Sequence, residues 1–227
     1  MYHEVGDESF RPLNRQGEMI PQRDPQTDAY RPSARAMNFR SEPFGINNLA
    51  QQEKIKQIAA VCEIGLHASS LTQHQPQQIE IEMQRLAQIV GYQPNSNRQH
   101  FLLFNLPFTY QQLIKAGVTH DYTMGYAEQT GFRAGTARAF KWFDLQKNEV
   151  TSLTVHPFVY MDGTLLEYLQ LSPTDAKARI QALYKEVQKY GGAFSFLWHN
   201  ETISGYQHWE SYQSVFKENF LINQANN

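Results

Sequence analysis

The chain has 227 residues, of which 41% are hydrophobic and 13% aromatic, a composition that suits one globular domain with a sizeable core. Its formal net charge of −2 argues against a general nucleic-acid or membrane-surface binder. The single cysteine, Cys62, excludes an internal disulfide, and its apolar neighbours predict a buried, inert thiol. No apolar run approaches 18 residues and no export leader is present as written, so we expect a cytoplasmic protein without a membrane span.

The first 45 residues differ in composition from the rest of the chain. They contain five prolines and show no sustained period of two or 3.6 residues, which predicts irregular structure with few buried contacts. We therefore expect an irregular, Pro-rich N-terminal segment over residues 1–45 and a folded domain over residues 46–222.

From Asn47 onward, apolar strand patterns alternate with amphipathic helix patterns. Strands are predicted over residues 61–67, 99–104, 122–126, 151–160 and 193–198, and helices over residues 48–60, 76–90, 110–116, 165–169, 172–190 and 209–220. Repeated strand–helix units predict an α/β fold with a mostly parallel sheet or a barrel.

Several polar residues lie at or just beyond the ends of the predicted strands. His199 follows the apolar stretch Ala193–Trp198, and His67, Arg133 and Asp162 occupy similar positions. Because chemistry in α/β folds is found at the carboxyl ends of strands, we expect His67, Arg133 and His199 to line one cleft. A His there is a candidate general acid or base. Plainer roles stay open: a strand-end His bonded to a loop, an ion-paired Arg133 and a turn residue at Asp162.

Three short segments resemble motifs of a known enzyme family. Residues 63–67, 131–135 and 196–200 are similar, in order and approximate spacing, to the second, third and fifth motifs of the polysaccharide deacetylases, the NodB-homology enzymes of carbohydrate esterase family four. Residues 96–101, 119–126 and 156–165 look like a divergent bacterial branch. The resemblance covers about residues 47–220 and implies a partial deformed (β/α) barrel that removes acetyl groups from N- or O-acetylated glycans.

The resemblance also implies a role for each matching residue. His67 matches the first His of the metal-binding motif, and neutral imidazole is a good ligand for zinc, cobalt or nickel. His199 matches the His that protonates the leaving amine, Arg133 the Arg that orients the catalytic carboxylate, and Asp162 the Asp that tunes that His. The substrate-binding candidates are Arg98, His100, Asp121, Tyr126 and Trp198.

Two departures from the family pattern leave the activity open. Leu71 stands where the family has its second metal His, and no apolar strand ending in Asp-Asp precedes Asn47. One possibility is a metal-dependent deacetylase that uses replacement ligands among His100, His120 and Asp121 or belongs to a longer active chain. The alternative is a catalytically inactive carbohydrate- or protein-binding module. We expect this chain alone to bind zinc weakly and to release little acetate.

Overall fold

The structure, a computed structural model, describes residues 22–23, 30–31, 48–204 and 207–224. The chain divides into two compact units, of which the larger contains residues 51–227. In the smaller unit the short strands β1 (Gln22–Arg23) and β2 (Tyr30–Arg31) pair antiparallel. The prediction of an irregular segment over residues 1–45 otherwise lies outside the described residues. None of the described helices combines the length and the hydrophobicity that a membrane span needs.

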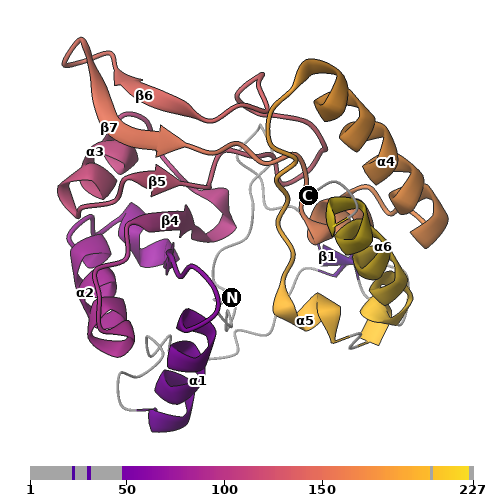
Figure 1. Cartoon of the computed structure of the whole chain (residues 1–227), viewed down its shortest axis with the longest axis horizontal. Helices are drawn as coiled ribbons and strands as arrows, with labels where there is room; N and C mark the ends of the chain where they lie inside the picture. Colours follow the sequence, from indigo (N-terminus) through magenta and orange to yellow (C-terminus); the bar gives the residue numbers. More distant parts are fainter. Residues whose placement is uncertain (1–21, 24–29, 32–47, 205–206, 225–227) are drawn as a thin grey trace. The chain divides into compact units, whose positions relative to one another are not determined.

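The larger unit is built on a five-stranded sheet (Figure 1). Four strands run parallel, and the remaining one, β6, is antiparallel to β7. The sheet confirms the predicted α/β class with mostly parallel strands. The sheet has β3 and β6 at its edges, and the partial deformed barrel that the resemblance implies stays a prediction. In spatial order the strands are β3 (Leu66–Ala68), β4 (Ser96–Gln99), β5 (His120–Asp121), β7 (Glu149–Val155) and β6 (Phe140–Asp144).

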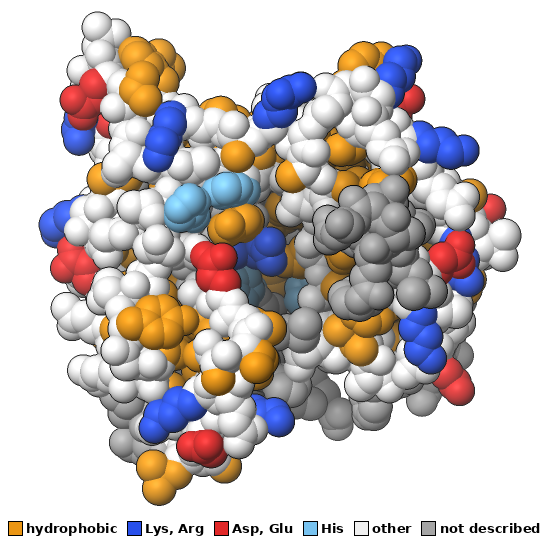
Figure 2. Space-filling model, in the orientation of Figure 1, with side chains coloured by type: hydrophobic (Ala, Val, Ile, Leu, Met, Phe, Trp, Pro, Cys, Tyr) orange, Lys and Arg blue, Asp and Glu red, His pale blue; other side chains and the backbone are white. Residues whose placement is uncertain are grey.

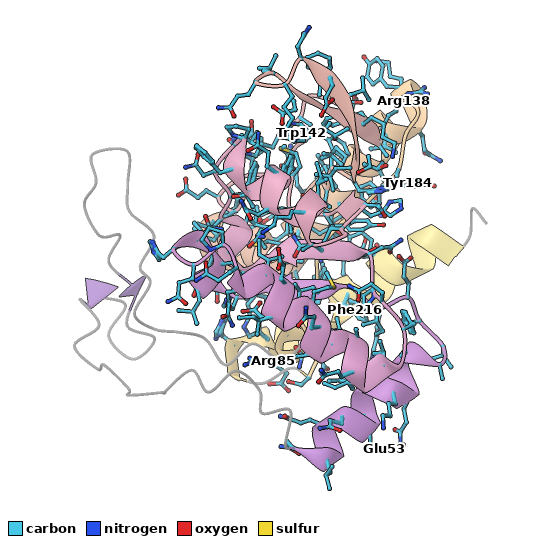
Figure 3. The ribbon with its side chains drawn as sticks, turned by 90° about the vertical axis from the view of Figure 1, so that its left-hand side faces the viewer. Glu53, Arg85, Arg138, Trp142, Tyr184 and Phe216 are labelled. Carbon is cyan, nitrogen blue, oxygen red and sulfur yellow. The ribbon has the colours of Figure 1, made fainter. Side chains whose placement is uncertain are left out.

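Helices α2 (Gln78–Val90) and α3 (Phe108–Lys115) pack against one face of this sheet. In α2 the side chains at spacings of three and four are the buried ones, Ile79, Met83 and Leu86, as the sequence predicts. The first core forms where they meet Leu113, Leu153 and Trp142, and Figure 3 labels Trp142 among these packed side chains. Glu53, also labelled there, belongs to α1 (Leu49–Ala59), which has no buried residue.

A second core lies in the C-terminal part of the larger unit, where α4 (Pro173–Tyr190) and α6 (Gln213–Gln224) pack together. As predicted, Ser172 caps α4: its Oγ accepts a hydrogen bond from the Asp175 backbone N at 3.1 Å. The shorter elements here are a π-helical turn (Thr164–Tyr168), α5 (Asn200–Ile203) and a 3-10 helix (Gln207–Tyr212). The buried residues of this second core include Tyr160, Leu165, Ile180, Tyr212 and Val215.

The strand predicted over residues 193–198 is only partly formed. It is extended and makes one parallel bridge, between Met161 and Leu197. The Leu197 N donates to Tyr160 O at 3.0 Å, and the Asp162 N donates to Leu197 O at 3.1 Å. These bonds align the two segments side by side, so that the residues that follow them, Asp162 and His199, meet.

Several predicted boundaries are wrong at the level of a few residues. The strand expected over residues 61–67 is only Leu66–Ala68, and Val61 is 81% exposed. Cys62 is exposed, not buried, because α1 ends at Ala59 and the chain turns across the surface before entering the sheet. The hairpin of β6 and β7 was not predicted. β6 buries Trp142 and Asp144 while Lys141 and Phe143 are exposed, so its burial pattern does not follow an alternation of apolar and polar residues.

Candidate functional site

The most strongly connected pair of candidate residues is Asp162 and His199. Asp162 is fully buried, and its Oδ1 lies 2.6 Å from His199 Nδ1. The same carboxylate accepts hydrogen bonds from the backbone N of His199 at 2.8 Å, the backbone N of Gly163 at 2.8 Å and Thr202 Oγ1 at 2.5 Å. Each carboxylate oxygen therefore has two donors, so the buried charge is fully solvated by the protein. This confirms neither role predicted for the two residues, but it does bring them together.

The Asp162 contact defines which nitrogen of His199 is available for chemistry. A carboxylate only accepts hydrogen bonds, so His199 Nδ1 carries the proton that points at Asp162. Its Nε2 is then the atom that gains or loses a proton, while the negative charge of Asp162 stabilises the imidazolium form. The His199 side chain is 31% exposed, so part of the ring is accessible to solvent. Such a pair can act as a general acid or base.

Glu167 is a titratable neighbour of this pair that the sequence analysis did not single out. It lies in the π-helical turn that starts two residues after Asp162, and its Oε1 is 3.6 Å from His208 Nε2. Partial burial raises the pKa of the Glu167 carboxyl, the nearby charge of His208 opposes that rise, and the charge of Asp162 adds to it. π-Helical turns are frequent at functional sites, so this turn could have pointed to Glu167. The sequence pattern of residues 164–168 does not distinguish a π-helical turn from an ordinary short helix.

The predicted metal ligand, His67, lies in a second group of side chains. Its Nδ1 is 2.8 Å from the backbone O of Arg98; because a carbonyl only accepts, Nδ1 carries a proton, and in the neutral ring the lone pair is then on Nε2. The ring of His100 is 5.2 Å away and stacks on Phe101 at 3.9 Å. Phe101 has a φ of 55°, unusual for a non-glycine residue and typical of strained functional segments.

These residues do not fit a zinc site. In the part of the chain that the structure describes, no three His, Cys, Asp or Glu side chains are placed to hold a metal ion together. A zinc ion in a protein has three or four protein ligands, and His67 alone supplies one. The described residues therefore do not provide the group of three ligands that a zinc centre needs, and the role of His67 as a metal ligand stays a prediction.

Asp121 was predicted to contact substrate or to replace a metal ligand, but the structure places it in the core. It is 0% exposed and accepts hydrogen bonds from Asn97 Nδ2 at 3.0 Å, Tyr110 Oη at 3.1 Å, and both the backbone N and Oγ1 of Thr123 at 3.0 and 2.7 Å. Burial raises the pKa of its carboxyl, and the hydrogen bonds from these donors oppose part of that rise. In β5 the Asp121 side chain points to the buried face of the sheet, which favours a structural role, so we do not include it in the site.

The remaining candidates have the following surroundings. The Arg133 guanidinium lies over the Phe104 ring at 4.5 Å, and the residue is exposed. Trp198 is 9% exposed and packs against Phe216, labelled in Figure 3, with ring centroids 5.3 Å apart, so its side chain is part of the second core. Tyr126 is half-buried in the loop after β5. The meeting of His67, Arg133 and His199 in one cleft stays a prediction.

A separate cavity of about 510 Å³ lies between α4 and residues 131–138. Its lining is mainly apolar and includes Phe132, Leu183 and Tyr190, with Arg138 and Glu186 as its charged residues. None of the candidate site residues lines it, so it does not add to the chemistry of Asp162 and His199.

Comparisons with known proteins give similarity in fold only. No protein-family model matches the chain, and no curated protein does. A crystal structure from Mycobacterium smegmatis, provisionally assigned as a polysaccharide deacetylase, has a TM-score of 0.47 and 17% identity, over 66% of this chain and 54% of that one. One from Bordetella bronchiseptica, provisionally assigned as a polysaccharide deacetylase involved in O-antigen biosynthesis, has a TM-score of 0.42 and 10% identity, over 75% of this chain and 73% of that one. This chain thus spans about half the length of the first.

Proposed function

We propose that the chain belongs to a hydrolase that removes acetyl groups from N- or O-acetylated glycans, with Asp162 and His199 as its acid–base pair. The observation that carries this proposal is the 2.6 Å contact between His199 Nδ1 and a buried carboxylate that is fixed by three further donors. The resemblance of residues 63–67, 131–135 and 196–200 to deacetylase motifs supports the same reaction class.

The chemistry requires a proton donor at the leaving group. When an acetamide is hydrolysed, water adds to the carbonyl carbon, the carbon–nitrogen bond breaks, acetate leaves, and the nitrogen gains a proton. A protonated His199 Nε2 can supply that proton, because Asp162 holds the ring at Nδ1 and stabilises its positive charge. Arg133, exposed beside Phe104, is proposed to hold an anionic group of the reacting complex.

We assign no step to a metal ion. Among the described residues, no three His, Cys, Asp or Glu side chains are grouped to hold a metal ion. This observation favours a second candidate function, a glycan-binding module that has kept the fold and the His199 pair without turnover.

Acetate release tests the proposal. The purified chain is incubated with an N-acetylglucosamine tetrasaccharide and with an O-acetylated xylan, with and without added zinc, cobalt or nickel. We expect slow turnover that falls by roughly a hundred-fold or more in His199→Ala and Asp162→Asn, a loss typical for a general acid. His74→Ala, which removes an exposed His outside the site, is the matched control.

Turnover that is unchanged in both site variants would contradict the assignment of the acid–base pair. Binding of the tetrasaccharide without any acetate release, under every metal condition, would instead support the binding module.

A further inference from the structure

Four side chains from four neighbouring parallel strands form one row across the sheet. His67 in β3 pairs with Arg98 in β4. Tyr122 and His156 directly follow Asp121 and Val155, the residues paired at the ends of β5 and β7. The ladder continues through them, because the Tyr122 N donates to Asn97 O at 2.8 Å and the His156 N donates to Asp121 O at 2.8 Å. We call His67, Arg98, Tyr122 and His156 the polar row.

The polar row lies on the face of the sheet opposite to the first core. Successive side chains of a strand point to opposite faces, and the neighbours of the row, Leu66, Asn97, Asp121 and Val155, are all buried on the other side. The four row residues are partly exposed. Figure 2 shows histidine side chains gathered near the middle of one face of the molecule, next to a basic and an acidic side chain. This face of the sheet is polar and partly exposed at these four residues, so that solvent or a ligand can contact it.

Direct contacts connect the members of the polar row. His67 Nδ1 is bonded to Arg98 O at 2.8 Å, and Arg98 Nε donates to Tyr122 O at 3.1 Å. The Tyr122 and His156 rings stack with centroids 4.5 Å apart at an angle of 13°. One half of the row thus carries donors, and the other half presents a flat aromatic surface of the kind on which sugar rings pack.

The charge of Arg98 is not neutralised by a contacting carboxylate. Among the described residues its guanidinium has no carboxylate oxygen within 4.0 Å; its contacts are the Tyr122 carbonyl and the Phe158 ring, 5.7 Å away. Burial lowers the pKa of Arg98 to about 10, so the side chain is still a cation at neutral pH. Because Nε is engaged with Tyr122, the two terminal nitrogens are the donors that a ligand would meet.

Two carboxylates lie near the polar row, and neither contacts Arg98. Asp121 is on the opposite face of the sheet and is fully engaged with Asn97, Tyr110 and Thr123. Glu63 Oε1 accepts a hydrogen bond from Ser96 Oγ at 2.9 Å, and its charge acts on the His156 and Tyr122 end of the row. The end formed by His67 and Arg98 is therefore the cationic one.

We propose that the polar row is a subsite for an anionic substituent of the glycan, a carboxylate or a sulfate ester, with Arg98 as its principal contact and the stacked Tyr122 and His156 under the adjoining sugar. A guanidinium matches a carboxylate or sulfate with two parallel hydrogen bonds, which a lysine cannot reproduce. The inference rests on the proposed function for the identity of the ligand as a glycan and specifies its charge.

Binding measurements by calorimetry test the subsite, and they use the full chain with His199→Ala so that turnover does not interfere. The probes are a neutral N-acetylglucosamine tetrasaccharide, a tetrasaccharide of alternating N-acetylglucosamine and glucuronate, and a sulfated N-acetylglucosamine tetrasaccharide. We expect Arg98→Gln to weaken binding of at least one anionic probe by roughly ten-fold or more, and Arg98→Lys to weaken it less. Binding of the neutral probe should change by less than about two-fold, a change too small for a lost charged contact.

A loss of affinity for the glucuronate probe in Arg98→Gln would identify a carboxylate as the ligand group, and a loss for the sulfated probe would identify a sulfate ester. Added salt should weaken binding of the affected probe in the parent protein and much less in Arg98→Gln, a dependence that general damage to the fold would not produce. A melting temperature for each variant identifies any loss of folding, and Arg98→Lys keeps the charge if Arg98→Gln is unstable.

Equal affinity of the protein for neutral and anionic probes would overturn the inference. So would an Arg98→Gln or Arg98→Lys variant that loses as much affinity for the neutral probe as for the anionic ones. The two proposals fail separately. Acetate release from neutral and anionic glycans at the same rate, without a binding preference, would remove only the subsite, whereas an Arg98-dependent charge preference without acetate release would remove only the deacetylase.

Discussion

His199 Nδ1 and Asp162 Oδ1 lie 2.6 Å apart, although 37 residues of chain separate them. Thr202 joins the pair, because its Oγ1 lies 2.5 Å from Asp162 Oδ2. We expect Thr202→Val to lower the free energy of unfolding by about 1–3 kcal/mol, since it removes one donor to a buried carboxylate, and to reduce turnover less than His199→Ala does. Urea unfolding and acetate release measure the two effects. An unchanged free energy of unfolding would show that Thr202 does not support Asp162.

A second prediction concerns Gly125, which touches the ring beneath Arg98. A Cβ at Gly125 would lie 2.2 Å from the Phe158 ring, and Phe158 is fully buried and cannot easily move. We expect Gly125→Ala to cost about 1–3 kcal/mol of unfolding free energy through overpacking.

Gly163→Ala is the control for Gly125→Ala. A Cβ at Gly163 would meet Met161 and Glu167 at ordinary distances of 3.6 and 3.8 Å. Its φ of −58° is helical, so alanine fits there without strain. Equal destabilisation by the two substitutions, measured by urea unfolding, would contradict the close packing of Gly125 and Phe158.

A third prediction tests the structural role of Asp121. Replacing it by Ala leaves the donors of Asn97, Tyr110 and Thr123 without their acceptor inside the core. We expect Asp121→Ala to lower the free energy of unfolding by about 3 kcal/mol. Glu80→Ala breaks an exposed ion pair with Lys115 at 3.1 Å and should cost less than about 1 kcal/mol. Full stability of Asp121→Ala together with lost glycan binding would return Asp121 to the list of ligand contacts.

A fourth prediction concerns the stability of the protein in weak acid. Burial is the largest of the causes that lower the pKa of His156 below 6.5. The charge of His120, whose Nδ1 is 2.8 Å from His156 Nε2, and the charge of Lys141 lower it further, while the charge of Glu63 opposes part of this shift. The folded state therefore binds fewer protons at His156 than the unfolded state does. Its contribution to stability is complete above pH 6.5 and is lost as the pH falls toward the depressed pKa.

Melting temperatures measured between pH 7.5 and 5 check this prediction. The decrease on acidification should be smaller in His156→Gln than in the parent protein, because Gln does not titrate, while the carboxylates titrate equally in both. His74→Gln, which changes an exposed His, should follow the parent protein. Identical curves for His156→Gln and the parent protein would mean that His156 is not held in its neutral form.

A fifth prediction concerns zinc. His67 has a lone pair at Nε2, but the described residues supply no group of three ligands, so we expect weak zinc binding by the whole chain. Calorimetric titration of zinc into the chain and into His67→Ala measures it, with His74→Ala as the control. Tight, stoichiometric binding that survives in His67→Ala would mean that other residues form a metal site.

Local sequence patterns were sufficient for the longer helices and for the fold class. The spacing of Ile79, Met83 and Leu86 identified α2, and the Ser172 cap with Pro173 identified the start of α4, because both signals lie within a few neighbouring residues. The alternation of apolar stretches with amphipathic helix patterns correctly predicted α/β structure. The exact strands were less predictable: β5 has only two residues, and a period of two cannot be recognised over so short a run.

The alternation of strands and helices, together with the resemblance of short motifs, was enough to select His67, Asp162 and His199 as candidates from the sequence alone. Only the tertiary structure decided which candidates meet. The parallel alignment of residues 158–162 with 195–198 brought Asp162 to His199. The sheet register placed Arg98 beside His67 on the partly exposed face of the sheet. It turned Asp121, which pairs with the residue before Arg98, into the core. The physical reason is that strand pairing is a long-range choice: a shift of one residue exchanges the two faces of a strand, and nothing within a two- to four-residue strand specifies that choice.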